Sequence, residues 1–378
     1  MTRIDAPWLT DAAAQQVCAM LTDAGHQAWF VGGCVRNALL GEPVSDLDIS
    51  TDAHPARVIA LAKAAGLKPV PTGIDHGTIT VVVDGHPFEV TTFRKDVETD
   101  GRRAVVAFAD TMDDDARRRD FTMNALYADR TGQVADPLGG LPDLMARQVR
   151  FIEDADRRIK EDYLRILRFF RFHAWYGRDD IDADGLSACA MNSAGIESLS
   201  RERVGQEILK LLSAPDPAPA LAAMQASGVL HRVLPGADAV PVAVLVHLEG
   251  GVGVLPDPIR RLAALGGQDV TERLRLSKAD DRRLEKLRDT DASPAMLGYR
   301  FGADTARDRL LVLSAVLGQT LPPDDIAAAK HGAAQIFPLK AADLMDRYQG
   351  PALGRALKEA ENRWLESDFT LTKDDLLA

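Results

Sequence analysis

The hydrophobic pattern of this chain changes near residue 150, and that change limits the folds open to it. Residues 1–150 combine strand-like alternation with helical spacing. The run TITVVVDGHPFEVTTF, for example, has two alternating halves joined by Asp84-Gly85, a pair typical of hairpin turns. From Asp154 onward almost every periodic segment places its apolar residues at helical spacing. We therefore predict an α+β fold, with a mixed sheet and helices in 1–150 and only helices afterwards. Turn-forming, Pro-containing stretches divide the helical part, and the predicted domains are 1–150, 151–214, 215–290 and 291–378.

Composition argues against several classes of protein. The chain has 378 residues, enough for at least two domains, and a formal net charge of -11, which argues against a protein that coats nucleic acid indiscriminately. It has no apolar run long enough to span a bilayer and no signal-peptide core at its start, so we expect no membrane association and a cytoplasmic location. The three cysteines lie far apart in the sequence, which fits a reducing compartment and offers no zinc motif.

Residues 30–50, FVGGCVRNALLGEPVSDLDIS, contain a pair of aspartates that could bind a metal ion. Asp46 and Asp48 are two positions apart in a segment expected to be a strand, so their carboxylates should point to the same side. Two carboxylates this close repel each other unless a cation lies between them, and Mg²⁺ prefers such oxygen ligands. Taken alone, the same pattern is more often a solvated strand face.

Two further features favour a site for a nucleoside triphosphate. The Gly32-Gly33 turn joins an expected strand to a short helix, where backbone N–H groups can approach phosphate oxygens and Arg36 can pair with them. A Gly-Gly pair alone indicates no more than a tight turn. Glu89, on the second half of the predicted hairpin, brings a third carboxylate toward the first two, as a site for two metal ions requires.

The segment RRRDFTMNALYAD, residues 117–129, contains the next candidates. The acidic run before it suits a helix N-terminus, so Arg119 and Asp120 are expected on the first turns of a helix. Consecutive arginines usually form no more than a charged helix face. Asn124, expected to face inward among apolar neighbours, is harder to explain in that way.

A long helix is predicted over residues 157–176, within EDYLRILRFFRFHAWYGR. Arg165, Arg168 and Arg171 follow one another at i+3 on it, so like charges line one flank unless anionic groups offset them. Asp162 precedes Arg165 by three residues. If these two side chains pair, they present an acid-plus-guanidinium edge that can hydrogen-bond the Watson–Crick side of a base. Residues 200–212 are expected to form a salt-bridged surface helix.

Taken together and in this order, the segments resemble the class II tRNA nucleotidyltransferase (CCA-adding enzyme) and bacterial poly(A) polymerase family. The resemblance rests on GGCVRN with DLDI, FEVTTFR, RRRDFTMNAL with DPLGG, EDYLRILRFFRF and ERVGQEILK, and it covers residues 28–212. It implies a polymerase-β-like nucleotidyltransferase head at 1–150, followed by an all-helical neck that selects the base (151–214), a body (215–290) and a tail that binds tRNA (291–378).

The resemblance also implies roles for single residues. Asp46 and Asp48 would hold Mg²⁺ with Glu89 as the third catalytic carboxylate, and Asp162 with Arg165 would pair with the base of CTP or ATP in place of a template. Residues 94–103 match a loop that helps the switch from C to A addition. The family usually has aspartate at the position of Asn37, which leaves open how Arg36 is oriented. The expected nucleotide-binding residues are Gly32, Gly33, Arg36, Arg119, Asp120, Asn124, Asp162, Arg165, Arg168 and Arg171.

The activity expected from the resemblance is template-independent addition of CCA to the 3′ end of tRNA, with release of pyrophosphate. A poly(A) polymerase of the same family is the nearest alternative, and we expect it to carry a basic C-terminal extension, whereas this sequence ends in SDFTLTKDDLLA. Addition of CC alone or A alone stays open. A glycosyltransferase with a D-x-D metal site would give no reason for the arginines beside Asp162, and a non-catalytic RNA-binding protein would be free to lose all three carboxylates.

Overall fold

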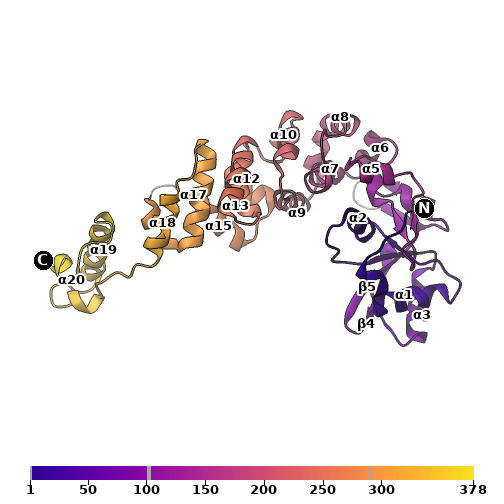
Figure 1. Cartoon of the computed structure of the whole chain (residues 1–378), viewed down its shortest axis with the longest axis horizontal. Coiled ribbons are helices and arrows are strands. Elements are labelled where there is room, and N and C mark those ends of the chain that lie inside the picture. Colours follow the sequence, from indigo (N-terminus) through magenta and orange to yellow (C-terminus); the bar gives the residue numbers. More distant parts are fainter. Residues whose placement is uncertain (1, 100–103, 289–291) are drawn as a thin grey trace. The chain divides into compact units, whose positions relative to one another are not determined.

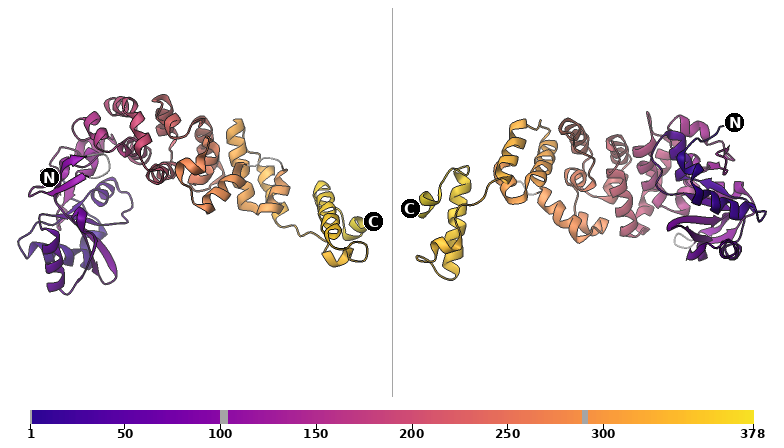
Figure 2. Two further views of the ribbon diagram at one scale, coloured as in Figure 1. Left: turned by 180° about the vertical axis from the view of Figure 1, so that it is seen from behind. Right: turned by 60° about the horizontal axis from the view of Figure 1, so that its bottom comes forward.

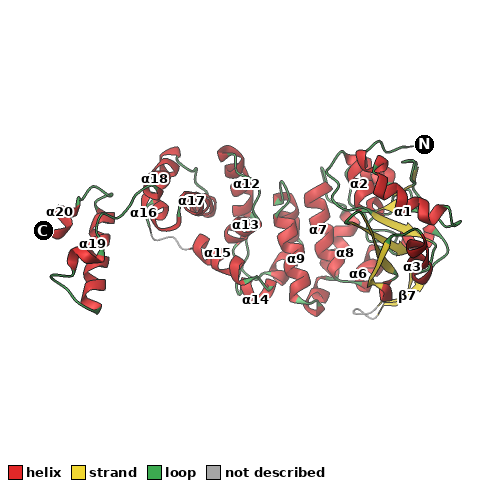
Figure 3. Ribbon diagram, turned by 90° about the horizontal axis from the view of Figure 1, so that it is seen from below, coloured by secondary structure: helices red, strands yellow, loops and turns green. Residues whose placement is uncertain are grey.

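The computed structural model describes residues 2–99, 104–288 and 292–378 and forms two compact units (Figure 1). The first comprises Met1–Leu211 and Pro219–Val233, and the second comprises Leu212–Ala218 and Leu234–Ala378. Within the described residues, strands occur only in the first unit (Figure 3). The α+β prediction is therefore confirmed. The predicted domain boundary at 290/291 lies outside the described residues.

The first unit is built on a seven-stranded sheet in the order β3-β4-β5-β2-β1-β8-β9. β2 and β5 run parallel and the other neighbours are antiparallel. The predicted hairpin is present, since β4 and β5 pair with Val83 opposite His86. A separate hairpin consists of β6 and β7. The strands are β1 (Trp29–Val31), β2 (Asp48–Thr51), β3 (Lys68–Gly73), β4 (Thr78–Val83), β5 (His86–Thr92), β6 (Arg94–Thr99), β7 (Ala104–Phe108), β8 (Tyr127–Ala128) and β9 (Val134–Ala135).

Two helices, α1 (Ala12–Thr22) and α3 (Pro55–Ala64), pack together against β4 and β5 (Figures 1 and 2). The alternation predicted for these strands explains this packing. Ile79, Val81, Phe88 and Val90 are buried, whereas Glu89 between the last two is exposed. The sheet therefore has one apolar face and presents the Glu89 carboxylate on the other.

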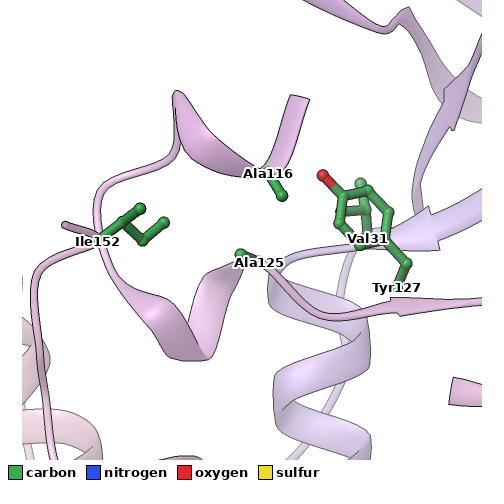
Figure 4. Packing of buried hydrophobic residues seen from close by; sticks show 5 residues of the cluster. All are labelled: Val31, Ala116, Ala125, Tyr127 and Ile152. Atoms are coloured by element: carbon green, nitrogen blue, oxygen red, sulfur yellow. The ribbon is translucent and has the colours of Figure 1, made fainter. Parts of the chain in front are cut away.

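The rest of the first unit is helical apart from β8 and β9. A buried cluster of Val31, Ala116, Ala125, Tyr127 and Ile152 joins the sheet to the segments that follow it (Figure 4). The helices are α2 (Gly33–Leu40), α4 (Met112–Arg117), α5 (Leu141–Met145), α6 (Ala155–Glu161), α7 (Leu164–Tyr176), α8 (Ala183–Met191), α9 (Arg201–Leu212), α10 (Ala218–Ala226) and α11 (Val229–Val233), with 3₁₀ helices η1 (Pro7–Thr10), η2 (Ile74–His76), η3 (Thr122–Asn124) and η4 (Ser193–Ser198).

Three sequence-based expectations about local structure were wrong. The helix predicted over 157–176 is interrupted at Asp162, whose backbone is extended and whose carboxylate accepts a hydrogen bond from the Leu164 N–H at 3.1 Å. The segment RRRDFTMNALYAD is not one helix, because α4 ends at Arg117 and the chain continues through η3 into β8. Asp46 lies in the loop before β2, because the pairing of β2 with β5 begins only at Asp48, although β5 itself starts at His86.

The second unit contains only helices among its described residues. α16 and α18 pack backbone to backbone, because a Cβ atom on Gly298 would lie 1.9 Å from the Ala329 oxygen and one on Gly332 would lie 1.8 Å from the Ala295 oxygen. No helix in the described part of the chain is long and apolar enough to cross a membrane. The helices are α12 (Val240–Val252), α13 (Pro258–Leu265), α14 (Val270–Leu274), α15 (Lys278–Arg288), α16 (Pro294–Phe301), α17 (Ala303–Leu317), α18 (Pro323–Ala333), η5 (Ala341–Leu344), α19 (Pro351–Glu366) and α20 (Lys373–Leu377).

Candidate active site

The glycine turn lies between β1 and α2, as the sequence predicts. Gly32 caps α2 with φ 71° and ψ -118°, a backbone conformation that favours glycine. Its N–H donates to the Leu126 oxygen at 3.3 Å, which ties the turn to the segment before β8. A Cβ atom on Gly32 would lie 3.2 Å from Arg119 Nη1. The turn is therefore closely approached by a guanidinium group, and its glycine leaves the room that this approach needs.

The parallel pairing of β2 with β5 places Asp48 directly opposite Glu89. The protein atoms around the Asp48 carboxyl and the charges of Glu89 and Asp46 raise its pKa, although Arg119 acts in the opposite direction and the residue stays exposed. Asp46 is turned toward Ser45, whose hydroxyl donates to it at 2.8 Å. Asp48 and Glu89 form no salt bridge within the described part of the chain. The carboxylates of Asp48 and Glu89 thus lie close together, and no positively charged side chain among the described residues forms a salt bridge with either.

The donor set fits a divalent cation in its chemistry. Carboxylate oxygens are the ligands that Mg²⁺ prefers, and a bound cation would offset the repulsion from Glu89 and Asp46 that, after desolvation, raises the pKa of Asp48. Among the described residues, however, no group of three or more acidic, histidine or cysteine side chains is already arranged around a metal position. One oxygen of Asp46, Oδ2, is already occupied by the Ser45 hydroxyl.

Arg119 is held in place by Asp115 and Tyr127, two residues that the sequence did not single out. Arg119 Nη2 donates to Asp115 at 3.1 Å, and its Nε donates to the Tyr127 hydroxyl at 3.3 Å. Asp115 is fully buried; burial opposes its ionisation, but Arg119 and Arg118 outweigh that effect and lower its pKa to about 2. The only early signal was the position of Asp115 in the acidic first turn of α4. Arg119 therefore approaches Gly32 from a fixed, charged support.

Arg36 is buried and does not point freely toward the glycine turn. Its Nη1 donates to Asn124 at 2.5 Å, its Nη2 donates to the Tyr176 hydroxyl at 2.8 Å, and its guanidinium carbon lies 4.1 Å from the Tyr176 ring centre. Asn37 accepts from Arg36 Nε at 3.1 Å while its own amide donates to the Pro43 oxygen at 2.7 Å. A neutral asparagine therefore orients Arg36, and it also secures the loop that leads to Asp46.

Asp120 and Asn124 extend this network to α7. The two oxygens of the buried Asp120 carboxylate accept hydrogen bonds from the Phe121 N–H at 2.9 Å, from Asn124 Nδ2 at 2.8 Å and from Arg168 Nε at 2.7 Å. Burial opposes ionisation of Asp120, but Arg168 and the hydrogen bonds lower its pKa to about 2. The inward orientation predicted for Asn124 is observed. A continuous chain of polar contacts thus links Arg36 on α2 with Arg168 on α7.

The arginines of α7 are offset by acidic partners, but not all by those that the sequence suggested. Arg165 pairs with Glu161 at 2.6 Å and donates to the Arg158 oxygen at 2.7 Å. Arg171 pairs with Glu207 of α9 at 2.6 Å. Each of the three arginines has its own acid, which removes most of the repulsion expected along this flank.

The pairing of Asp162 with Arg165 was predicted wrongly. Asp162 instead accepts a hydrogen bond from Arg203 Nη2 of α9 at 2.7 Å. Arg203 stood in a segment taken for a salt-bridged surface helix, and its spacing gave no sign of this partner. The reason is the helix break at Asp162, because residues three apart approach each other only on a continuous helix.

The structure thus groups the candidates into three sets. Gly32, Asp48, Glu89 and Arg119 lie near one another at the sheet, with Asp46 in the loop beside them, where it accepts a hydrogen bond from Ser45. A second set is the buried network of Arg36, Asn124, Asp120 and Arg168. A third set consists of Asp162, just before α7, and of Arg165 and Arg171 on α7, each of which has a different partner. In the loop predicted at 94–103, residues 94–99 form β6 and residues 100–103 lie outside the described residues.

Comparisons with known proteins agree with this arrangement. The model of the poly A polymerase head domain family matches residues 28–150, and that of the probable RNA and SrmB-binding site of polymerase A matches residues 180–240. The CCA-adding enzyme of Streptococcus pyogenes serotype M2 is 41% identical over 225 residues, which are 59% of this chain and 54% of that enzyme. The chain thus spans about half the length of this curated relative.

Two further relatives match over most of their length. The mitochondrial CCA tRNA nucleotidyltransferase 1 of Mus musculus is 31% identical over 376 residues, covering 93% of this chain and 86% of the mouse protein. The crystal structure of the Bacillus stearothermophilus CCA-adding enzyme in complex with CTP superposes with a TM-score of 0.72 at 26% identity, covering 96% of this chain and 94% of that one. The fold is thus a nucleotidyltransferase head with a helical body and tail, and nucleotidyltransferases generally use divalent metal ions. The chain belongs to the family of CCA-adding enzymes and poly(A) polymerases.

Proposed function

We propose that this protein adds CMP, CMP and AMP from CTP and ATP to the 3′ end of tRNA without a nucleic-acid template. The observation that carries the proposal is the parallel register that sets Asp48 opposite Glu89 at the edge where Gly32 begins α2. This combination places acidic oxygens beside the N-terminus of α2. The names of the streptococcal and mouse relatives supply the reaction.

In the proposed reaction, the terminal 3′-hydroxyl of tRNA attacks the α-phosphate of the nucleotide and pyrophosphate leaves. Asp46 and Asp48 would hold Mg²⁺ with Glu89 as a third carboxylate, and bound Mg²⁺ would lower the pKa of the hydroxyl and offset the charge of the triphosphate. Gly33 and the N-terminus of α2 would offer N–H groups to the phosphates, with Arg119 beside them, while Gly32, whose own N–H donates to Leu126, would turn the backbone toward them. Arg36, whose three nitrogens already donate to Asn37, Asn124 and Tyr176, would support this turn from within the protein.

We propose that the neck, residues 151–214, selects the base. Asp162 lies in the break between α6 and α7 and is partly exposed, so its carboxylate can reach the edge of a base. Arg165 would take part after exchanging its bond to Glu161. Asp120, Arg168 and Arg171 would hold the helix that carries this edge. We further propose the division into head (1–150), neck (151–214), body (215–290) and tRNA-binding tail (291–378), and a cytoplasmic location.

Incubation of the protein with tRNA that lacks its CCA end tests this proposal. Labelled CTP, ATP, UTP and GTP are supplied singly and together with Mg²⁺, and products are resolved at single-nucleotide resolution. Two C additions followed by one A and a stop are expected. A long A tail would assign the chain to the poly(A) polymerases, which the head-domain match equally allows. An Asp48→Asn variant serves as the inactive control.

A further inference from the structure

The facing sides of α7 and α9 are joined by a row of contacts that starts at the helix break before α7 (Figure 3). The first contact is the pair of Asp162 with Arg203, and the next is the pair of Arg171 with Glu207. Partners that come later in α7 meet partners that come later in α9, so the two helices run in the same direction. The row therefore leads away from the position proposed to read the base.

The last contact of this row leaves an aromatic surface exposed. Trp175 Nε1 donates to the backbone oxygen of Lys210 at 2.7 Å, so the one polar atom of the indole is already used within the protein. Trp175 is nevertheless 39% exposed, and what its ring offers to solvent is carbon surface. The Lys210 residue is itself exposed in the last turn of α9. The row thus ends in an oriented aromatic ring beside a cation.

An exposed apolar side chain by itself is common on protein surfaces, and Met191 of α8, which is 71% exposed, is an example. Trp175 differs because a hydrogen bond fixes its ring and because a row of contacts connects it to Asp162. Single-stranded nucleic acids bind to this combination, since a base stacks on the ring while a cation attracts the phosphate.

We propose that Trp175 is a stacking platform for a base in the single-stranded 3′ end of tRNA, upstream of the nucleotide being added. This inference rests on the proposed function, in which Asp162 contacts the incoming base. From Leu164, the first residue of α7, to Trp175 the helix extends about 16 Å at roughly 1.5 Å per residue. A stacked strand covers that length with about five nucleotides at roughly 3.4 Å each, and an extended strand with fewer. Trp175 therefore meets the acceptor RNA and not the base of CTP or ATP.

The kinetics of A addition to tRNA that ends in CC test this platform with the variants Trp175→Leu and Trp175→Phe. Both lose the indole N–H and its bond to Lys210, but only phenylalanine keeps an aromatic face. We expect Trp175→Leu to raise the KM for tRNA about tenfold or more, Trp175→Phe to recover most of that loss, and the KM for ATP to stay unchanged in both. Met191→Ala is the matched control, because it removes an exposed apolar side chain from the same unit, and it should change neither KM.

Tryptophan fluorescence provides a measurement that needs no turnover. A single-stranded RNA with the 3′ sequence of tRNA should quench the emission of the wild type, and a blunt RNA duplex should quench it less. Trp175→Phe retains Trp8, Trp29 and Trp364 and should lose the quenching by the single strand.

Equal KM values for tRNA in the folded Trp175→Leu and Trp175→Phe variants, or quenching that survives in Trp175→Phe, overturn the inference. A wild type that forms dimers, together with a monomeric Trp175→Leu that binds RNA unchanged, also overturns it, since a second copy of the chain would then cover the ring. If the wild type adds no nucleotide to tRNA but single-stranded RNA still quenches Trp175, the proposed function fails and the stacking platform stands.

Discussion

Replacing Asp120 with asparagine tests whether the buried contact between the head and α7 depends on charge. The substitution keeps the shape of the side chain and an oxygen for the Phe121 and Asn124 donors. It removes the negative charge beside Arg168 and directs an N–H group toward that guanidinium. Two donors then face each other in a site where the Asp120 side chain is 9% exposed.

The size of the effect follows from the pKa of Asp120. Lowering it from the ordinary value of 3.8 to about 2 corresponds to about 2 kcal/mol of stabilisation at neutral pH, since each pKa unit is worth roughly 1.4 kcal/mol. Leaving Arg168 without its acid adds to the loss, and breaking a buried pair typically costs about 3–5 kcal/mol. Because Arg168 keeps some access to water, we expect Asp120→Asn to destabilise the first unit by about 2–4 kcal/mol.

Urea unfolding followed by amide hydrogen exchange measures this loss. Amides of α7 report on the first unit, and those of α16 in the second unit serve as an internal reference. Asp156→Asn is the matched control, because Asp156 forms an exposed pair with Lys160 and its loss should leave the exchange of α7 unchanged.

The stabilisation by Asp120 should depend on pH in a direction that its pKa fixes. The folded pKa lies below the unfolded one, so the contribution of Asp120 is complete above about pH 5 and is lost as the pH falls toward 2. The stability difference between wild type and Asp120→Asn should shrink over that window. A difference below about 1 kcal/mol at pH 7, or one that stays constant down to pH 3, would refute the electrostatic reasoning.

Three further predictions concern other parts of the chain. Asp48→Asn should abolish nucleotide incorporation, yet the midpoint of thermal unfolding without divalent ions should stay the same or rise, because partial desolvation and then the charges of Glu89 and Asp46 raise the pKa of Asp48. Gly332→Ala should destabilise the second unit by about 1–3 kcal/mol in urea unfolding, whereas Gly250→Ala, which meets no atom within 4 Å in α12, should stabilise it by about 0.5–1 kcal/mol. Asn37→Asp should keep an acceptor for Arg36 but lose the donor to the Pro43 oxygen, so amide exchange in residues 41–47 should become faster while that of β4 does not.

Local signals in the sequence were sufficient for much of the fold. The hairpin at Asp84-Gly85 and the turn at Gly32 depend on backbone conformations that few residues adopt, so their composition reveals them. The alternation in β4 and β5 showed that Glu89 lies on the strand face opposite the buried Phe88 and Val90. The helical spacing found from Asp154 onward likewise predicted helices such as α15, because an amphipathic surface helix carries its own pattern.

Interruptions of those patterns were harder to foresee. The break at Asp162 lies within a continuous helical pattern, and beside it the Tyr163 ring packs on Gly195, more than thirty positions further along the chain. Asp46 has alternating neighbours, but the pairing of its segment with β5 begins only at Asp48 and β1 ends where the glycine turn begins. Pairing partners are properties of the sheet, and a single strand does not encode them.

The sequence by itself determined which chemical groups this protein has and roughly which elements carry them: a glycine turn, three carboxylates and a row of arginines. Only the tertiary structure decided which side chains form hydrogen bonds and ion pairs with one another. Arg36 bonds to Tyr176 across 140 positions and to Asn124 across 88, and Asp162 bonds to an arginine 41 positions away rather than three. The physical reason is the length and flexibility of the guanidinium side chain, which reaches any acid or hydroxyl that folding brings near, so that local spacing does not select its partner.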